Sequence, residues 1–83
     1  MTREVAWSPG AVADLRKLDP PIAARVVEAV TRFAECGQGD VRRLQAVSRE
    51  FRLRVGDWRV RFDETPERAI HVLRVLHRSG VYR

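Results

Sequence analysis

The chain has 83 residues, of which 45% are hydrophobic, and this composition suits one globular domain spanning residues 1–83 and argues against a disordered chain. No apolar run approaches the roughly 18 residues of a membrane-spanning helix, and the first residues lack the apolar stretch of a secretory signal, so we expect a cytoplasmic protein without a membrane anchor. The 16 basic and 11 acidic residues give a net charge of +5, which favours a polyanionic partner.

The first half of the chain predicts a strand followed by two helices. Residues 3–7 alternate loosely between polar and apolar side chains, as in a short strand. Ser-Pro at 8–9 and Asp-Pro at 19–20 each place a capping residue before a proline suited to the first helical turn, and apolar residues follow both pairs at helical spacing. We therefore expect a helical hairpin, whose second helix ends near Gly37.

The stretch FRLRVGDWRVRF, residues 51–62, predicts a β-hairpin. Apolar and basic side chains alternate on both sides of Gly56 and Asp57, which suit a two-residue loop of type I′ or II′. This loop pairs apolar residues with apolar residues across the strands, so the register is self-consistent. The same register sets arginines opposite each other: Arg54 faces Arg59, and Arg52 faces Arg61.

Two further segments complete the predicted sheet. Residues 41–44 suit a short extended piece, and residues 69–76 are apolar and β-branched, as in a central strand covered on both sides. The predicted order is β-α-α-β-β-β. This order indicates an α+β fold, in which a helical hairpin packs on an antiparallel sheet that ends in a β-meander.

Positive charge is concentrated in residues 41–62. Seven arginines there meet only two acidic residues, Glu50 and Asp57, whereas the rest of the chain has nine basic and nine acidic residues. Like charges directly opposite each other on neighbouring strands are destabilising, so the facing arginines need an explanation. We interpret them as a phosphate-binding face; the alternative is a solvated face on which arginine stems cover apolar surface.

Three motifs in chain order resemble the RelE toxins of the RelE/ParE toxin–antitoxin superfamily. They are DLRKLD at 14–19, FRLRVGDWRVRF at 51–62 and VLRVLHRSGVY at 72–82. The resemblance covers nearly the whole chain and implies a compact α+β domain with a helical hairpin against an antiparallel sheet. It also implies a ribosome-dependent endoribonuclease that cuts mRNA in the ribosomal A site.

The resemblance further implies a partner and the absence of a cofactor. RelE-like toxins are blocked by an antitoxin encoded nearby, with which they form a hetero-oligomer, and they cut mRNA without a metal. The sequence agrees with the second point, because no group of Asp, Glu, His and Cys residues has the spacing of a metal site. We therefore expect no metal and no other cofactor.

Individual residues take expected roles from the same resemblance. Arg59 matches a family position that contacts the reacting phosphate, and Arg78 matches a second catalytic arginine. Tyr82 matches a tyrosine that acts on the substrate or stacks beside it. Arg52 and Arg54 match positions at which some members carry lysines that transfer protons. The arginines that we expect to bind RNA are Arg42, Arg43, Arg52, Arg54 and Arg61.

These residues do not identify the general base of the reaction. Without a metal, the 2′-hydroxyl of the RNA serves as the nucleophile and must lose its proton, but the guanidinium groups of Arg52 and Arg54 do not accept one at neutral pH. His77 is a catalytic candidate because imidazole transfers protons near neutral pH. On an ideal strand it would point away from its neighbour Arg78, so the two need a bend to act together. We interpret His71, in mid-strand, as a packed residue.

Two other functions remain open. The first is a ParE-like toxin that inhibits DNA gyrase on the same fold and has no nuclease chemistry. The second is a basic nucleic-acid- or protein-binding module without catalysis. The codon preference, the identity of the antitoxin and the stoichiometry of the complex do not follow from the sequence.

Overall fold

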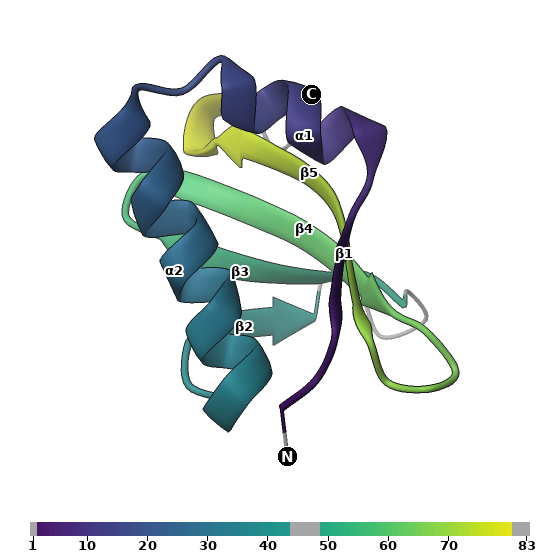
Figure 1. Cartoon of the computed structure of the whole chain (residues 1–83). Helices are drawn as coiled ribbons and strands as arrows, with labels where there is room; N and C mark the ends of the chain where they lie inside the picture. The colour runs from purple at the N-terminus through teal and green to yellow at the C-terminus, as the bar shows by residue number, and fades with distance from the viewer. Residues whose placement is uncertain (1, 44–48, 81–83) are drawn as a thin grey trace.

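The computed structural model describes residues 2–43 and 49–80, which form an α+β domain (Figure 1). This confirms the predicted fold class. The elements in chain order are β1 (Val5–Trp7), α1 (Pro9–Arg16), α2 (Pro20–Cys36), β2 (Asp40–Arg43), β3 (Phe51–Val55), β4 (Trp58–Glu64), β5 (Ile70–His77) and the short 3₁₀ turn η1 (Arg78–Gly80). Among the described residues, no helix is long and apolar enough to cross a membrane.

Local signals set the ends of both helices. The Ser8 hydroxyl accepts a hydrogen bond from the Ala11 N–H (3.1 Å), so that Ser8 caps α1 as expected. Asp19 occupies the corresponding position of α2, but its side chain makes no capping hydrogen bond. Gly37 ends α2 in the left-handed conformation (φ +73°), which glycine adopts without steric cost, and its N–H donates to the Phe33 carbonyl (2.8 Å).

The five strands form one sheet in the order β1-β5-β4-β3-β2. The predicted meander is antiparallel, but the sheet as a whole is mixed, because β1 pairs with β5 in parallel while the other pairs are antiparallel. Alternation within a short edge strand does not reveal the direction in which it joins a sheet, and mixed sheets are common. The extended piece expected at 41–44 is β2, although residue 44 lies outside the described residues.

The β3–β4 hairpin has the predicted register. Val55 pairs with Trp58, and the pairing continues to the far end of the hairpin, where Phe51 meets Phe62. Gly56 has a positive φ (+59°) and Asp57 does not, which is the pattern of a type II′ loop rather than type I′.

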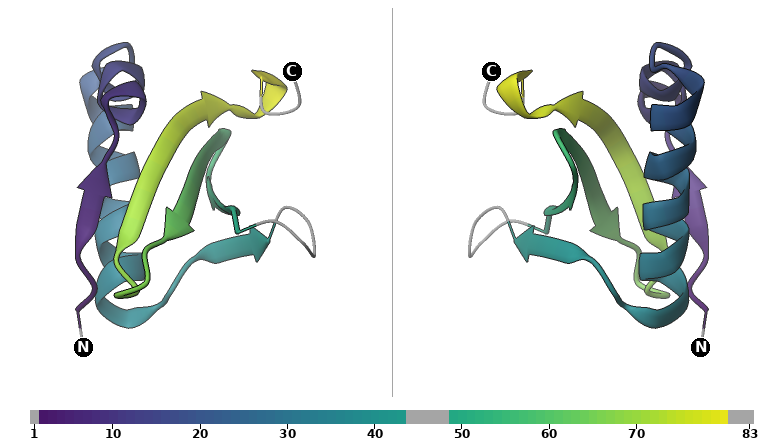
Figure 2. Two further views of the ribbon diagram at one scale, coloured as in Figure 1. Left: turned by 90° about the vertical axis from the view of Figure 1, so that its right-hand side faces the viewer. Right: turned by 90° about the vertical axis from the view of Figure 1, so that its left-hand side faces the viewer.

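Both helices cover one face of the sheet and leave the other uncovered. In Figure 2, α2 stands against one side of the strands, and β2 diverges from β5, so that the uncovered face is concave. The expectation that 69–76 is covered on both sides is therefore wrong. A bulge at Leu73 explains the misleading pattern, because the extra residue interrupts the alternation of β5. The buried core lies between the helices and the sheet and comprises Ala11, Val26, Val30, Ala34, Leu53, Val60, Phe62, Ile70, Val72 and Val75.

Beyond the end of β1, Ser8 and helix α1 lie along the edge of β5. The Ser8 N–H donates to the Val72 carbonyl (2.9 Å), and the Ser8 hydroxyl donates to the Leu73 carbonyl (2.8 Å). Further along α1, the Asp14 carboxylate accepts from the Val75 N–H (2.9 Å). Side chains of α1 thus satisfy backbone groups of β5 that have no strand beside them.

The Asp14 carboxylate also binds Arg74. Arg74 Nε donates to Oδ2 at 2.7 Å and Nη2 to Oδ1 at 3.1 Å, while Asp14 is only 7% exposed. Burial tends to raise the pKa of Asp14, but the hydrogen bonds from Arg74 and Val75 and the charges of Arg74 and Lys17 outweigh it, so that this pKa lies below 3.8. The same contact raises the pKa of Arg74.

Asp14→Asn should lower the free energy of unfolding at pH 7 by about 1–3 kcal/mol, because it removes a charged acceptor from a buried position. The folded pKa of Asp14 is depressed, so its contribution is fully present above the unfolded value of 3.8 and is lost as the pH falls through the lower folded value. Denaturant midpoints of wild type and variant should therefore differ at pH 7 and converge near pH 2. Asp19→Asn, which removes a carboxylate without a capping bond, is the control. Equal midpoints at pH 7 would contradict this role of Asp14.

Candidate nucleic-acid interface

Strand pairing arranges the residues of the uncovered face in two rows across the sheet. Side chains alternate along each strand, so cross-strand partners point to the same face. Because Leu53, Val60 and Val75 are buried against the helices, their neighbours along the strands point outward. The first row is Arg42, Arg52, Arg61 and Arg74. The second row is Asp40, Arg54, Arg59 and Leu76.

Carboxylates neutralise most of the first row. Glu50 binds Arg61 through two oxygens, with Nη2 at 2.7 and 2.8 Å and Nε at 3.1 Å. Asp14 binds Arg74, and a looser pair joins Arg42 to Asp40 at 3.8 Å. Arg61, expected to bind RNA, is therefore first of all an ion-pair partner of Glu50.

The second row holds its arginines differently. Arg59 Nη1 donates to the carbonyls of Gly56 (2.9 Å) and Trp58 (3.0 Å), so its guanidinium folds back toward the hairpin loop. Arg54 is exposed and stands opposite Arg59. Within the described part of the chain, neither forms an ion pair with a carboxylate. Asp40 faces Arg54 from β2 but pairs loosely with Arg42, so this level of the sheet holds two arginines against one carboxylate.

An open hollow of about 260 Å³ lies over the same level, lined by Asp40, Arg42, Arg52, Arg54 and Arg59. A guanidinium offers several fixed N–H donors and suits phosphate oxygens well. The hollow therefore brings together four of the seven arginines expected to act on RNA. Arg43 is not among them, because it pairs with Phe51 on the other face and lies over that ring, with Cζ 5.8 Å from its centroid.

The end of β5 lies beside the hairpin loop. The chain leaves the strand after His77 and turns through η1, and the Arg78 N–H donates to the Asp57 carbonyl (2.8 Å). The bend required by the sequence is therefore present, and it holds the backbone of Arg78 against the loop to which Arg59 also bonds. Tyr82 lies outside the described residues.

His77 lies on the helix side of the sheet. It pairs with Trp58, and the two rings meet edge to face with centroids 5.2 Å apart. Its Nδ1 accepts from the Ser79 N–H (3.3 Å) and lies 2.9 Å from the Ser79 hydroxyl. Since Arg59 follows Trp58 on the same strand, His77 and Arg59 point to opposite faces.

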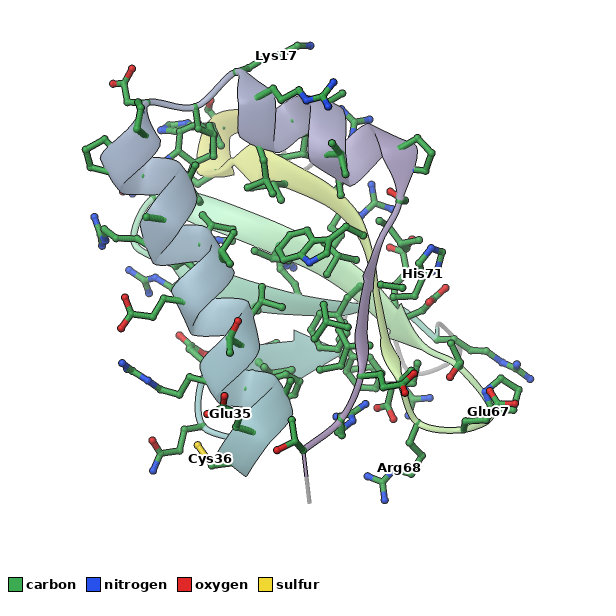
Figure 3. The ribbon with its side chains drawn as sticks, viewed as in Figure 1. Lys17, Glu35, Cys36, Glu67, Arg68 and His71 are labelled. Atoms are coloured by element: carbon green, nitrogen blue, oxygen red, sulfur yellow. The ribbon has the colours of Figure 1, made fainter. Side chains whose placement is uncertain are left out.

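His71, interpreted from the sequence as a packed residue, is instead half-exposed on the concave side. It stands opposite Asp63, and its Nδ1 is 3.3 Å from Asp63 Oδ1. In Figure 3 its side chain lies away from α2, whose last turn is marked by Glu35 and Cys36. This pair can be found only when the register of β4 and β5 is known. The bulge in β5 interrupts the alternation of its side chains, so the sequence pattern does not predict that register.

A family model for the ParE toxin of type II toxin–antitoxin systems, parDE, matches residues 5–82. The chain belongs to the RelE/ParE toxin superfamily. It is thus by family a type II toxin–antitoxin toxin, and the expected superfamily is confirmed. No match was found among proteins of curated function.

Three solved structures of this superfamily share the fold. The RelB–RelE complex of Methanococcus jannaschii is 21% identical, covers 93% of this chain and 94% of its own, and superposes with a TM-score of 0.76. The RelBE2 toxin–antitoxin complex of Mycobacterium tuberculosis is 29% identical, with coverage of 93% and 99% and a TM-score of 0.72. The RelE–RelB complex of Pyrococcus horikoshii OT3 is 23% identical, with coverage of 98% and 100% and a TM-score of 0.79.

Arg54→Thr should stabilise this RelE/ParE domain slightly and weaken its binding to RNA. Threonine is a good strand former, and its introduction removes the repulsion with Arg59, worth a few tenths to about 1 kcal/mol at low salt. Denaturant midpoints at low and high salt measure the first effect. Titrations with single-stranded RNA across the same salt range should show a slope smaller by roughly one phosphate contact.

Arg16→Ala removes the same charge from an exposed position on α1 and is the control for binding. It should leave the affinity for RNA nearly unchanged. If Arg54→Thr instead destabilises the domain and binds RNA like the wild type, the arginine stems serve as structural cover.

Proposed function

We propose that this chain is a ribosome-dependent endoribonuclease that cuts mRNA without a metal, using the 2′-hydroxyl of the RNA as the nucleophile. The observation that carries the proposal is the hollow on the concave face, which is lined by four arginines and one carboxylate, Asp40. Within the described part of the chain, its Arg54 and Arg59 form no ion pair. Charge in such a place suits a transition state in which negative charge grows on phosphate oxygens. On a surface that only contacts solvent, an arginine directly opposite another arginine would destabilise the sheet without serving any purpose.

In this proposal, Arg59 and Arg78 stabilise the charge on the reacting phosphate. Arg42, Arg52 and Arg54 hold the neighbouring backbone, while Arg43 and Arg61 contact RNA further from the hollow. Tyr82 stacks on or acts on the substrate, and His77 contributes from the end of β5. The proposed reaction uses no metal.

The proposed partner in resting cells is an antitoxin. The three structures compared above are toxin–antitoxin complexes. An acidic, amphipathic segment of such a partner would neutralise the arginine rows and bury apolar surface, giving a hetero-oligomer.

Arg59→Ala should slow single-turnover cleavage of mRNA on programmed ribosomes by about a hundredfold or more, the usual loss when one charge-stabilising contact is removed. Arg16→Ala should cleave like the wild type, because Arg16 lies on α1. An mRNA with a 2′-deoxy nucleotide at the cut position should resist cleavage by the wild type. Near-normal cleavage by Arg59→Ala would remove Arg59 from the site, and cleavage of the deoxy substrate would refute the internal nucleophile.

The isolated toxin should melt at a lower temperature than its complex with the antitoxin. A partner at one hundred times its dissociation constant adds about 2.7 kcal/mol to the free energy of unfolding, which raises the melting temperature of a domain of this size by about 10 °C or more. Differential scanning calorimetry with the neighbouring gene product measures the shift. A scrambled peptide of the same charge is the control, and equal shifts from both would show that charge alone, without a specific partner, stabilises the toxin.

Inhibition of DNA gyrase is the second candidate function. It is favoured by the family model, which is that of the ParE toxins. A supercoiling assay separates the two candidates: a gyrase inhibitor would block supercoiling and leave programmed ribosomes uncut, whereas the proposed nuclease would do the reverse.

A further inference from the structure

We propose that His77 is a positioning residue, which holds Arg78 in place for the reacting phosphate by capping the η1 turn; this inference rests on the proposed endoribonuclease activity. In that activity Arg59 and Arg78 act on the same phosphate, so the two must be held relative to each other. Arg59 lies within β4 and is fixed by strand pairing on both sides. Arg78 lies in η1, one residue beyond the last paired residue of β5. Groups other than the strand ladder must therefore hold Arg78.

Burial does not hold the η1 turn. None of its three residues is buried, and a Cβ placed on Gly80 would meet no atom of the described residues within 4 Å beyond its chain neighbours. A single 3₁₀ turn is also weakly stable by itself, because the geometry of its hydrogen bonds is poor. Hydrogen bonds to neighbouring groups therefore decide whether η1 keeps one conformation.

Hydrogen bonds enclose Arg78 from both sides. The Arg78 N–H donates to the Asp57 carbonyl (2.8 Å), which ties the start of the turn to the hairpin loop. On the other side of Arg78, the N–H of Ser79 donates to His77 Nδ1 (3.3 Å), and the Ser79 hydroxyl lies 2.9 Å from the same nitrogen. Arg78 is the middle residue of the loop that this contact closes. Its backbone is thus fixed at both ends, while its side chain is exposed.

His77 occupies the position of an N-cap for η1. It precedes the turn, and its side chain accepts from the second N–H of the turn, which is the contact that Ser, Asp and Asn make at helix starts. Because a backbone N–H only donates, Nδ1 directs its lone pair at Ser79, and the imidazole proton lies on Nε2. The ring itself is held by Trp58, which meets it edge to face at 5.2 Å and packs against the core. The cap is therefore anchored to the folded domain.

The hairpin loop bonds to both arginines of the proposed reaction. The Gly56 carbonyl accepts from Arg59 Nη1 (2.9 Å), and the next carbonyl, of Asp57, accepts from the Arg78 N–H. Successive peptide units thus hold the guanidinium of Arg59 and the backbone of Arg78. Loss of the His77 cap would free the backbone that follows Arg78 and move its side chain relative to Arg59. A displacement of about 1 Å in a reacting site can cost roughly a hundredfold in rate.

Two replacements of His77 separate its hydrogen bond from its ring. His77→Asn keeps an acceptor, Oδ1, at the position of Nδ1, and asparagine is among the best capping residues. His77→Phe keeps an aromatic ring beside Trp58 but has no acceptor. In single-turnover cleavage on programmed ribosomes, His77→Phe should be slower than wild type by about tenfold to a hundredfold, whereas His77→Asn should stay within about threefold.

Binding and stability should not follow the cleavage rates. Both variants should keep the melting temperature of the wild type, since His77 is exposed, and should bind ribosomes carrying the 2′-deoxy mRNA within about twofold of wild type. Equally slow cleavage by both variants would mean that the imidazole itself takes part in the chemistry. Wild-type cleavage by His77→Phe would mean that the cap is not needed. Either result would overturn the positioning role.

A double-mutant cycle tests whether His77 acts through Arg78. Arg78→Ala should slow cleavage by about a hundredfold or more. Adding His77→Phe to Arg78→Ala should change the rate by less than about twofold, because no guanidinium is left to position. A general structural effect of His77→Phe would slow both backgrounds alike, and such additivity would overturn the proposal.

Nitrogen-15 NMR of the imidazoles tests the cap without reference to activity. At about pH 8.5, above the ordinary titration range of imidazole, Nδ1 of His77 should give the signal of a nitrogen without a proton, and Nε2 that of a protonated one. The spectrum of His77→Asn assigns the signals. A proton on Nδ1 would overturn the cap. Failure of the wild type to cut any mRNA would overturn the proposed function together with this role of His77, whereas an active wild type with an unaffected His77→Phe would overturn this inference alone.

Discussion

The two-residue loop at Gly56 and Asp57 fixes the pairing of β3 with β4, and the placement of the hairpin arginines follows from that pairing. A shift by one residue would turn every side chain of a strand to the opposite face. A shift of β3 would remove Leu53 from the core and turn Arg54 into it, and a shift of β4 would do the same with Val60 and Arg59. The apolar core and the arginine face are therefore two consequences of the same register.

Carboxylates divide the arginine face into two parts. Asp14 and Glu50 come from outside the β3–β4 hairpin and neutralise Arg74 and Arg61 in the first row. The second row holds Arg59 by backbone carbonyls instead, which position the guanidinium without cancelling its charge. The first row thus contributes to the fold as well as to the surface, while Arg54 and Arg59 of the second row form no ion pair with a carboxylate of the described residues.

Local patterns predicted much of this fold. The hairpin register and the Ser8 cap depend on residues close in sequence, and both are observed. The parallel pairing of β1, the bulge at Leu73 and the contact of His71 with Asp63 depend on segments far apart in the chain. Alternation in a single strand carries no information about such neighbours, so His71 was misread as a packed residue. The Glu50–Arg61 ion pair could not be predicted for a different reason. Glu50 precedes β3, so strand alternation does not predict where its side chain points.

Strand alternation and the strand pairing together place His77 and Arg59 on opposite faces of the sheet. Trp58 and His77 share the helix side, whereas the hollow opens on the other. The η1 turn brings the backbone of Arg78 to the hairpin loop.

The central claim is that the concave arginine face acts on mRNA. It is tested most directly by mapping the 5′ ends of cellular transcripts after brief induction of the wild type and of Arg59→Ala, while the supercoiling of a reporter plasmid is followed in the same cells. The account predicts new 5′ ends within translated regions for the wild type, few for the variant, and unchanged supercoiling. Intact transcripts together with a loss of negative supercoiling would contradict it and identify gyrase as the target.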